Sequence, residues 1–502
     1  MNRRNACFFG VRYLTYMLFF AICLATVASA AEVYVIEIRK DIGKGLGEYI
    51  RRGIDTAEKD DADAIIFDIS TFGGAVVAMD DIVEDIYDTT IPTIAYVNSK
   101  AISAGAMIAI ACDQLVMRPG GKIGDAAPVY ATGQEAPEKV VSTIRGTIRA
   151  IAERQGRNKD IAEAMVDKDL VLVGIDGEIV ALIPEDYQQK KEEGVLMEVI
   201  SGEGKLLTLT TDDALKYEFA DAKAEDIDEL LKMYEIVEID GEYKALTSQT
   251  IAQKQSEGIE IGEITSLTGA DIRRISTNLA ERIAIFVTSP MISAMLLTFG
   301  GLGLLIELRT PGFGFPGIIG ILCLGLFFGG HAIANINASY AALAFVIGLG
   351  LLAFEVFVTP GFGVAGVLGI LSMLGGILFI FGRSYEPEEA ILWLSVSFIA
   401  TVGLGIVAFY TLPRTRTWQQ FVLSTAEDRE LGYQAPSVEL ENYSGKTGRA
   451  LTPLRPAGTA IIDGSRVDVV TEGNFISKDT PVKVVGVEGM RVIVQEIDDM
   501  DT

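Results

Sequence analysis

The sequence predicts an α/β domain followed by an α-helical transmembrane block and a small all-β barrel. Three observations predict this order. Short apolar strands alternate with helical patterns from Ala31 to about Ile285, charge almost disappears between 291 and 412, and five short strands follow residue 442. The mean hydropathy of +0.34 over 502 residues is higher than soluble domains show, so part of the chain lies in a membrane.

The amino terminus has the features of an export signal. Arg3, Arg4 and Arg12 precede an apolar run that ends in Ala28-Ser29-Ala30. A basic start, a short apolar core and an A-x-A site are typical of a cleavable secretory signal. We expect a signal peptide over residues 1–30; the alternative is an uncleaved anchor helix. Either one exports the domain that begins at Ala31.

The exported domain is expected over residues 31–285. Its predicted strands are Val33–Ile38, Ala64–Ile69, Thr93–Val97 and Gln114–Met117, and its predicted helices lie near Gly47–Glu58, Val76–Tyr87 and Glu138–Arg154. Each strand is short, apolar and bounded by polar residues, Gly or Pro. Their alternation with helices predicts a sheet of parallel strands.

The transmembrane block is expected over residues 291–412. Five spans, 291–308, 315–335, 341–358, 362–382 and 389–411, each approach the roughly 20 residues that cross a bilayer. A Thr-Pro-Gly-Phe-Gly turn at Thr310 recurs 49 residues later at Thr359 and predicts a duplicated helical hairpin. Glu307 and Glu355 precede these turns one position out of register, so they are not expected to be strict equivalents. The alternative interpretation is an acidic transport relay.

Five crossings from an exported domain place the carboxyl terminus in the cytoplasm. Arg309, Arg414 and Arg416 then lie inside, as the positive-inside rule requires, whereas Arg383 opposes it. A linker is expected over residues 413–442 and a barrel like the OB-fold over residues 443–502. Its predicted strands are Gly448–Ala450, Gly458–Ile462, Ser465–Val470, Pro481–Val487 and Arg491–Ile497.

Composition excludes several classes of function. With 42 Lys+Arg against 68 Asp+Glu, the net charge of −26 opposes nucleic-acid binding. We expect no metal and no cofactor, because the chain holds a single histidine, His331. That residue lies in a predicted span, where we expect it to be a polar packing residue. A Ser-His or Cys-His site in the exported domain is therefore excluded. Cys112 reads as a small core residue.

A serine activated by a lysine is the nucleophile that remains. Gly73-Gly74 follows a predicted strand, and such pairs allow the outward N–H groups that an oxyanion needs. Ser103 follows the next strand, has small neighbours and opens an apolar helix, whose N-terminus favours developing negative charge. The alternative role for Ser103 is a helix N-cap.

The base must be a lysine that loses its charge, although a free lysine has a pKa of about 10.4. Lys100, Lys122 and Lys139 are the candidates. Lys100 precedes Ser103 by three residues, Lys122 lies in a glycine turn and Lys139 lies just inside a predicted helix. The residues alone do not choose among them.

Phe72-Gly73-Gly74, Ser103-Ala104-Gly105 and Ala136-Pro137-Glu138-Lys139 resemble the NfeD family of membrane-bound, ClpP-class serine proteases. The resemblance covers nearly the whole chain and implies a ClpP/crotonase-like exported domain. It implies Ser103 as nucleophile and Lys139 as general base, with oxyanion donors at Gly74 and Ala104 and Gly73 shaping the loop.

The resemblance further implies a serine endopeptidase that cleaves apolar segments of stomatin- or prohibitin-like membrane proteins, and a dimeric or higher homo-oligomer. The sequence departs from the family pattern at Phe72, where proline is common, and at an insertion over residues 171–206 that predicts extra strands. The stretch after it, from Leu207 to Lys216, looks like a helix start of the family. The main alternative function is a catalytically silent scaffold for stomatin-like partners; a transporter and an acyl-CoA enzyme of the crotonase type are weaker alternatives.

Overall fold

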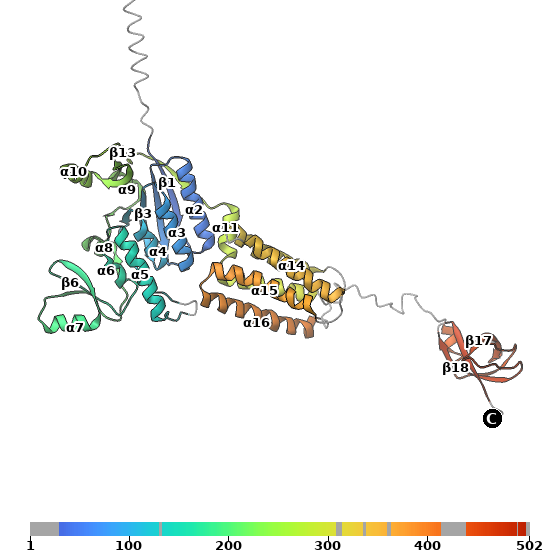
Figure 1. Cartoon of the computed structure of the whole chain (residues 1–502). Coiled ribbons are helices and arrows are strands. Elements are labelled where there is room, and N and C mark those ends of the chain that lie inside the picture. The colour runs from blue at the N-terminus through green and yellow to red at the C-terminus, as the bar shows by residue number, and fades with distance from the viewer. Residues whose placement is uncertain are drawn as a thin grey trace, which may run out of the picture. The chain divides into compact units, whose positions relative to one another are not determined.

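The computed structural model describes residues 30–129, 133–307, 314–334, 338–358, 363–412, 438–488 and 490–497. The chain forms two compact units, one ending at Thr415 and one beginning at Arg416. The first holds the α/β domain and the membrane helices, and the second holds the barrel (Figure 1). The predicted signal peptide lies outside the described residues, apart from its last alanine.

The α/β domain is built on a sheet in the order β10-β4-β3-β2-β1-β14, in which every neighbouring pair is parallel. These strands are β1 (Glu32–Ile38), β2 (Ala64–Thr71), β3 (Thr93–Ile102), β4 (Gln114–Met117), β10 (Ala222–Lys223) and β14 (Asp271–Ile275). The predicted strands and their parallel arrangement are confirmed. The central strand β2 is a nearly continuous buried apolar run because the sheet is covered on both faces there.

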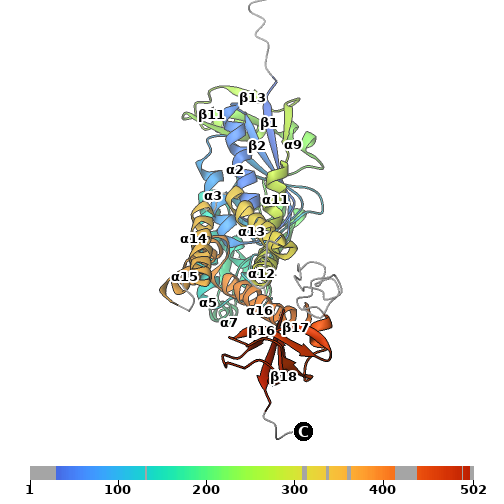
Figure 2. The ribbon, with the colours of Figure 1, turned by 90° about the vertical axis from the view of Figure 1, so that its right-hand side faces the viewer.

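Helices cover one face of the sheet and enclose the larger core (Figures 1 and 2). They are α2 (Lys44–Lys59), α3 (Val76–Asp88), α4 (Ala104–Ala111), α5 (Glu138–Arg154) and α6 (Lys159–Ala164). The opposite face packs against α9 (Ile227–Met233) and β11 (Tyr234–Ile239). All eight residues of α4 are buried, and this helix carries Ser103 at its start.

A bulge in β3 redirects the end of that strand. Ile69 of β2 pairs with Val97, but the next residue pairs with Lys100, so Asn98 and Ser99 are extra residues. The first part of β3 therefore pairs with β4, and its last three residues pair with β5 (Lys122–Gly124). β5 in turn pairs antiparallel with β9 (Thr208–Thr210). Bulges of this kind re-aim side chains next to functional sites.

The insertion over residues 171–206 forms a small antiparallel sheet of its own. β6 (Val171–Ile175) lies between β7 (Glu178–Leu182) and β8 (Glu198–Ser201), with α7 (Pro184–Glu192) between β7 and β8 in the chain. The expected helix start after it is confirmed at α8 (Thr211–Lys216), where Thr210 and Asp213 form a capping box. A third sheet joins β12 (Glu242–Thr247), β11 and β13 (Ile264–Ser266) beside α10 (Ser248–Ser256). α11 (Leu279–Val287) then leads into the membrane block.

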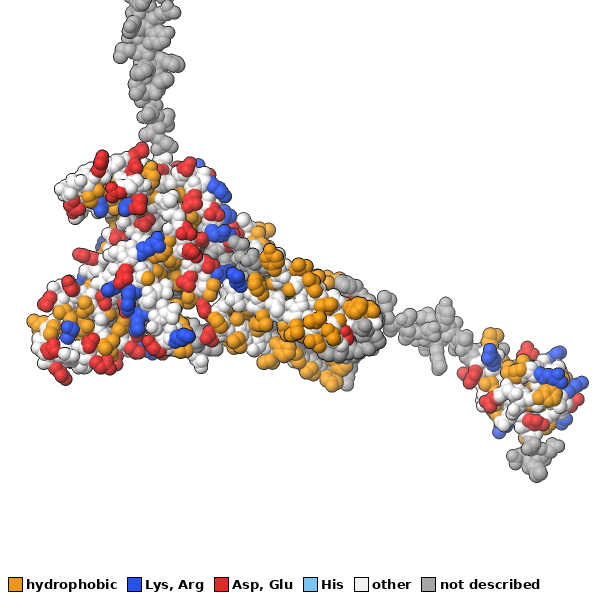
Figure 3. All heavy atoms as spheres, in the orientation of Figure 1, with side chains coloured by type: hydrophobic (Ala, Val, Ile, Leu, Met, Phe, Trp, Pro, Cys, Tyr) orange, Lys and Arg blue, Asp and Glu red, His pale blue; other side chains and the backbone are white. Residues whose placement is uncertain are grey.

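Five apolar helices follow, close to the predicted spans. They are α12 (Pro290–Glu307), α13 (Phe315–Ile333), α14 (Ala338–Phe357), α15 (Val364–Ser384) and α16 (Pro387–Thr411). Their outer surface is largely hydrophobic, whereas charges of both signs cover the α/β domain (Figure 3). Glycines let paired helices meet backbone to backbone: a Cβ on Gly303 would lie 2.7 Å from Gly320 Cα, and one on Gly369 2.8 Å from the Gly348 carbonyl oxygen.

Glu307 and Glu355 perform the same structural task, contrary to the sequence-based expectation. Glu307 accepts hydrogen bonds from the N–H groups of Gly314 (2.6 Å) and Gly317 (3.0 Å) at the start of α13. Glu355 accepts from Gly363 and, at 3.1 Å, from Gly366 at the start of α15. Glu307 lies seven residues before Gly314 and Glu355 eight residues before Gly363, so each carboxylate caps the N-terminus of the next helix although the spacing differs by one residue. Such capped carboxylates favour the duplicated hairpin over a transport relay.

His331 and Cys112 are packing residues, as the sequence predicted. His331 is fully buried in α13, with Nδ1 2.8 Å from the Phe327 carbonyl oxygen. Cys112 is fully buried in the α/β core, where desolvation raises the pKa of its thiol. A thiol with a raised pKa is a poor nucleophile.

The second unit is a closed five-stranded barrel in the order β15-β16-β17-β19-β18, which confirms the predicted all-β domain. Its strands are β15 (Thr447–Ala450), β16 (Ala457–Ile462), β17 (Ser465–Thr471), β18 (Pro481–Glu488) and β19 (Arg491–Glu496), preceded by the short helix α18 (Val438–Glu441). Its core is aliphatic, and closure leaves no unpaired strand edge.

Candidate active site

Ser103 occupies a sharp turn between β3 and α4. Its φ of 55° and ψ of −127° are unusual for a residue with a side chain. Its N–H donates to the carbonyl oxygens of Gly124 (3.0 Å) and Asp125 (3.1 Å), which fixes the turn to the end of β5. Backbone strain of this kind concentrates at functional sites, and nucleophiles in strand–turn–helix sites show it.

Small residues after Ser103 let α4 approach the sheet. A Cβ on Gly105 would lie 2.5 Å from Thr71 Cγ2, so only glycine fits there. The Ser103-Ala104-Gly105 motif therefore has a packing reason as well as the one inferred from the sequence. Ser103 does not act as a side-chain N-cap, because its hydroxyl forms no cap hydrogen bond with α4.

The Gly73-Gly74 loop lies directly against Ser103. Gly73 has a φ of 107°, and a Cβ there would lie 2.6 Å from Ser103 Cβ and 3.1 Å from Ser103 Oγ. The loop is held by Ile42, whose N–H donates to the Gly73 carbonyl (2.8 Å) and whose carbonyl accepts from Ala75 (2.7 Å). Glycine is required at both positions, because a Cβ on Gly74 would overlap the Ile42 backbone.

Thr71 is a supporting residue that the sequence did not single out. Its buried hydroxyl accepts from Gly73 N–H (3.0 Å) and donates to the Lys40 carbonyl (2.8 Å). These bonds fix the first peptide of the glycine loop. The only signal in the sequence was its place at the end of the strand, directly before the Phe-Gly-Gly run.

Two N–H groups beside Ser103 remain available. Within the described residues, neither Gly74 N–H nor Ala104 N–H donates a hydrogen bond, whereas the N–H groups of Gly73, Ala75 and Ser103 are all engaged. Ala104 is the first residue of α4, so its N–H also lies at the positive end of a helix dipole. A nucleophile with a donor on the next residue and another on a neighbouring loop can stabilise an oxyanion.

Lys139 forms no hydrogen bond with Ser103 within the described residues. It is the second residue of α5 and is exposed. Its carbonyl accepts from Thr143 Oγ1 at 2.9 Å, but across the described ranges its ammonium has neither a hydrogen bond nor an ion pair. In this conformation the N–H groups of Gly74 and Ala104 are unengaged beside Ser103, and the Lys139 ammonium has no partner among the described residues.

The other two candidate lysines lie side by side on neighbouring strands. Lys122 is exposed on β5, where it pairs in register with Lys100 of β3. The Lys100 ammonium lies 3.5 Å from the centroid of the Phe72 ring, a close cation–π contact. Phe72 is 70% exposed beside the glycine loop. Phe72, at the position where proline was expected, thus contacts a cation and remains largely exposed directly before the glycine loop.

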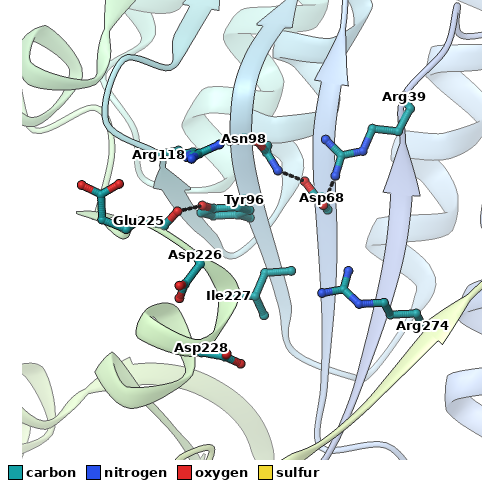
Figure 4. A pocket seen from close by; sticks show the side chains of 10 residues that line it. All are labelled: Arg39, Asp68, Tyr96, Asn98, Arg118, Glu225, Asp226, Ile227, Asp228 and Arg274. Carbon is teal, nitrogen blue, oxygen red and sulfur yellow. Dashed lines mark hydrogen bonds and ion pairs between the residues drawn. The ribbon is translucent and has the colours of Figure 1, made fainter.

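A cavity of about 350 Å³ lies on the face of the sheet that packs against α9, whose Ile227 and Asp228 line it (Figure 4). Asp68 is buried there and bonded to Arg39 and to Asn98 Nδ2 (3.1 Å), while Tyr96 donates to the Glu225 carbonyl (2.9 Å). Burial raises the pKa of Asp68 although the Arg39 charge opposes this. Because the buried polar groups of this cavity have partners in the chain, nothing here requires a ligand.

Comparison with known proteins identifies the family. Family models match residues 32–192 (NfeD1b, N-terminal domain), 291–414 (NfeD integral membrane domain) and 440–496 (NfeD-like C-terminal, partner-binding domain). Membrane protein NfeD1b of Bacillus subtilis is 33% identical over 478 residues, which cover 94% of each chain. The chain belongs to the NfeD family. Its integral membrane domain and five apolar helices make it a multi-pass membrane protein.

Another NfeD relative is named as an enzyme. Membrane-bound protease PH1510 of Pyrococcus horikoshii is 27% identical over 476 residues, 92% of each chain. Among solved structures, a variant of the membrane-bound stomatin-specific protease 1510-N with a substrate peptide is 26% identical, covering 51% of this chain and 98% of that one, with a TM-score of 0.36. ClpP1 from Listeria monocytogenes is 17% identical, covering 38% and 91%, with a TM-score of 0.27.

Proposed function

We propose that this NfeD protein is a membrane-anchored serine endopeptidase with Ser103 as nucleophile and Lys139 as general base. The observation that carries the proposal is the strained turn at Ser103, flanked by the unengaged N–H groups of Gly74 and Ala104. A relative that is aligned over 92% of its length and named a membrane-bound protease supports the same reaction class.

The proposed reaction is acyl transfer to water. The neutral amine of Lys139 takes the proton of Ser103 Oγ, which attacks a peptide carbonyl, and Gly74 and Ala104 donate to the resulting oxyanion. The C–N bond breaks as the lysine returns the proton to the leaving amine. The same lysine then takes a proton from water, which attacks the acyl-enzyme carbonyl; the bond from the acyl carbon to Ser103 Oγ breaks, and the lysine returns the proton to Oγ. Lys139 must reach Ser103 Oγ to take its proton. The contact is proposed to form when substrate binds, because catalytic hydrogen bonds are often long or absent in apo structures.

The α/β domain is proposed to lie outside the cytoplasm and the barrel inside it, following the predicted signal and the five spans. The substrate or partner is proposed to be a stomatin-like membrane protein. Two findings support this: the barrel matches a model described as partner-binding, and 1510-N is called stomatin-specific. A homo-oligomer is proposed from the family resemblance.

Cleavage by full-length protein in nanodiscs tests the assignment. An apolar peptide is followed with the wild type, Ser103→Ala and Lys139→Ala, alongside the matched controls Ser99→Ala and Lys122→Ala. Both site variants are expected to lose at least about a thousandfold in kcat/KM, because removal of a nucleophile or its base leaves only residual catalysis. The controls are expected to stay within about threefold. Cleavage that survives Ser103→Ala would reject the proposal.

The alternative is a catalytically silent scaffold that binds stomatin-like partners. The exposure of Lys139, which forms no hydrogen bond with Ser103 within the described residues, is the observation that favours it. Under this alternative no peptide is cleaved by any variant, and Ser103→Ala still retains a co-expressed stomatin-like protein on an affinity column. Cleavage products that appear with the wild type and vanish with Ser103→Ala would reject the scaffold.

A further inference from the structure

α11 (Leu279–Val287), which links the α/β domain to the membrane helices, has one face packed on protein. Glu281, Ala284 and Val287 are buried, and Glu281 forms an ion pair with Arg52 of α2. The contact with α2 is backbone to backbone, since a Cβ on Gly45 would lie 2.8 Å from Ile285 N. The rotation of α11 about its own axis is therefore fixed, so the face opposite these contacts always points away from α2.

The opposite face of α11 is apolar and uncovered. Leu279, Ile283 and Phe286 are spaced four and three residues apart, which places them on one stripe of the helix. Leu279 is 73% and Phe286 63% exposed. The chain thus presents two large hydrophobic side chains to its surroundings from a helix that has already buried its other face, an arrangement that marks an interaction surface.

The carboxyl end of α11 is locked to the ends of the membrane helices. Tyr385, which follows α15, donates to the Thr288 carbonyl at 2.7 Å, and its hydroxyl lies 2.8 Å from Ser293 Oγ of α12. Ser293 Oγ donates to the Val287 carbonyl at 2.7 Å. Figures 1 and 2 both show α11 between α2 and the near ends of these helices. Because α12 is a membrane span that begins at Pro290, α11 ends at the level of the bilayer surface.

The membrane span that follows α11 also exposes apolar side chains. On α12 the large exposed side chains are Met291, Met295, Phe299 and Leu305. Arg282, next to Ile283 on α11, is exposed and can meet lipid phosphates. An apolar stripe with a flanking cation, directly before a membrane span in the chain, is what an interfacial helix presents. We propose that α11 lies in the bilayer interface, with Leu279, Ile283 and Phe286 among the acyl chains just below the headgroups.

This placement brings the Ser103 site close to the membrane. Ile285 of α11 contacts Gly45, three residues after Ile42, and Ile42 holds the glycine loop that lies against Ser103. Three residues of chain span at most about 11 Å. The consequence, which rests on the proposed function, is a preference for peptide segments that adjoin a bilayer.

Fluorescence quenching tests the placement without any need for activity. Single cysteines replace Leu279, Phe286 or, as a control, the exposed Ile264 on β13, in a Ser103→Ala background whose cysteines outside the α/β core are alanine. Each is labelled with NBD in full-length protein in nanodiscs that contain shallow doxyl-labelled lipid. We expect at least twofold quenching at 279 and 286 and less than 1.2-fold at 264.

Equal quenching at all three positions would overturn the placement. So would disulfide-linked dimers of Phe286→Cys without lipid quenching, since the stripe would then be an interface between two copies. A second measurement tests the consequence: wild-type protein in nanodiscs is expected to cleave a lipid-anchored peptide with at least tenfold higher kcat/KM than the same peptide unanchored. If neither peptide is cleaved, the proposed function fails while the quenching result stands. If both are cleaved equally, the membrane-adjoining preference is wrong.

Discussion

Gly73→Ala tests whether the contact between the glycine loop and Ser103 controls activity. An alanine at a φ of 107° costs about 1–3 kcal/mol in backbone strain. Its Cβ would lie 2.6 Å from Ser103 Cβ, closer than real side chains approach, and such overpacking adds about 1–3 kcal/mol. The loop or Ser103 must therefore move, and the Gly74 donor moves with it. Displacing one oxyanion donor costs about 10²–10³ in kcat.

Gly120→Ala is the matched control for backbone strain alone. Its φ is also positive, at 78°, but no atom lies within 4 Å of an added Cβ. It is expected to cost about 1–2 kcal/mol of stability and less than twofold in kcat. Stability is measured as the temperature at which the buried thiol of Cys112 becomes reactive to a maleimide dye, in a Cys323→Ala background. If Gly73→Ala cleaves peptide as fast as Gly120→Ala, the contact does not position the site.

Three further predictions follow from other contacts. Phe72→Ala is expected to raise KM about tenfold for peptides with a large apolar side chain next to the scissile bond, but not for a glycine peptide. The reason is that the exposed ring can offer the substrate an apolar contact worth about 1.4 kcal/mol. Equal changes in KM for both peptides would show that the ring does not touch substrate. Burial raises the pKa of Asp85 from 3.8 to about 6, so the folded state holds more protons and stability should fall as pH rises from about 4 to 6; unfolding midpoints by circular dichroism should show this fall in the wild type and lose it in Asp85→Asn. Glu355→Ala should leave the N–H groups at the start of α15 unsatisfied, which should lower stability by about 1–3 kcal/mol. Hydrogen exchange of the amides in residues 363–370 should become faster in this variant. Substitution of the exposed Glu388 by alanine should leave that exchange rate unchanged.

The local pattern of apolar and polar residues predicted the helices and strands, because each helix or strand is determined largely by residues close together in the chain. β4 and α5 have the bounds that apolar runs and polar flanks predicted, and the membrane helices begin and end within a few residues of the charge-poor spans. Pattern also singled out the Gly73-Gly74 loop and Ser103 as candidates, because both follow predicted strands, although a serine before a helix can equally be an N-cap.

Contacts between distant residues decided the rest. The equivalence of Glu307 and Glu355 depends on a spacing to the next helix that is one residue longer for Glu355, which a fixed offset in the sequence conceals. The stripe on α11 became visible only when Arg52 and Gly45 fixed which face of that helix is buried. The residues alone could not choose the base, because whether a lysine meets Ser103 depends on how α5 and its preceding loop pack.

The sequence by itself determined that this chain has an α/β domain, five apolar helices and a β-barrel, and that a histidine-dependent protease site is absent from the α/β domain. These facts follow from composition and from periodicity along the chain. Only the tertiary structure decided that Ser103 adopts a strained turn against Gly73, with Gly74 and Ala104 N–H groups unengaged, because a positive φ and a close contact across 30 residues arise from packing.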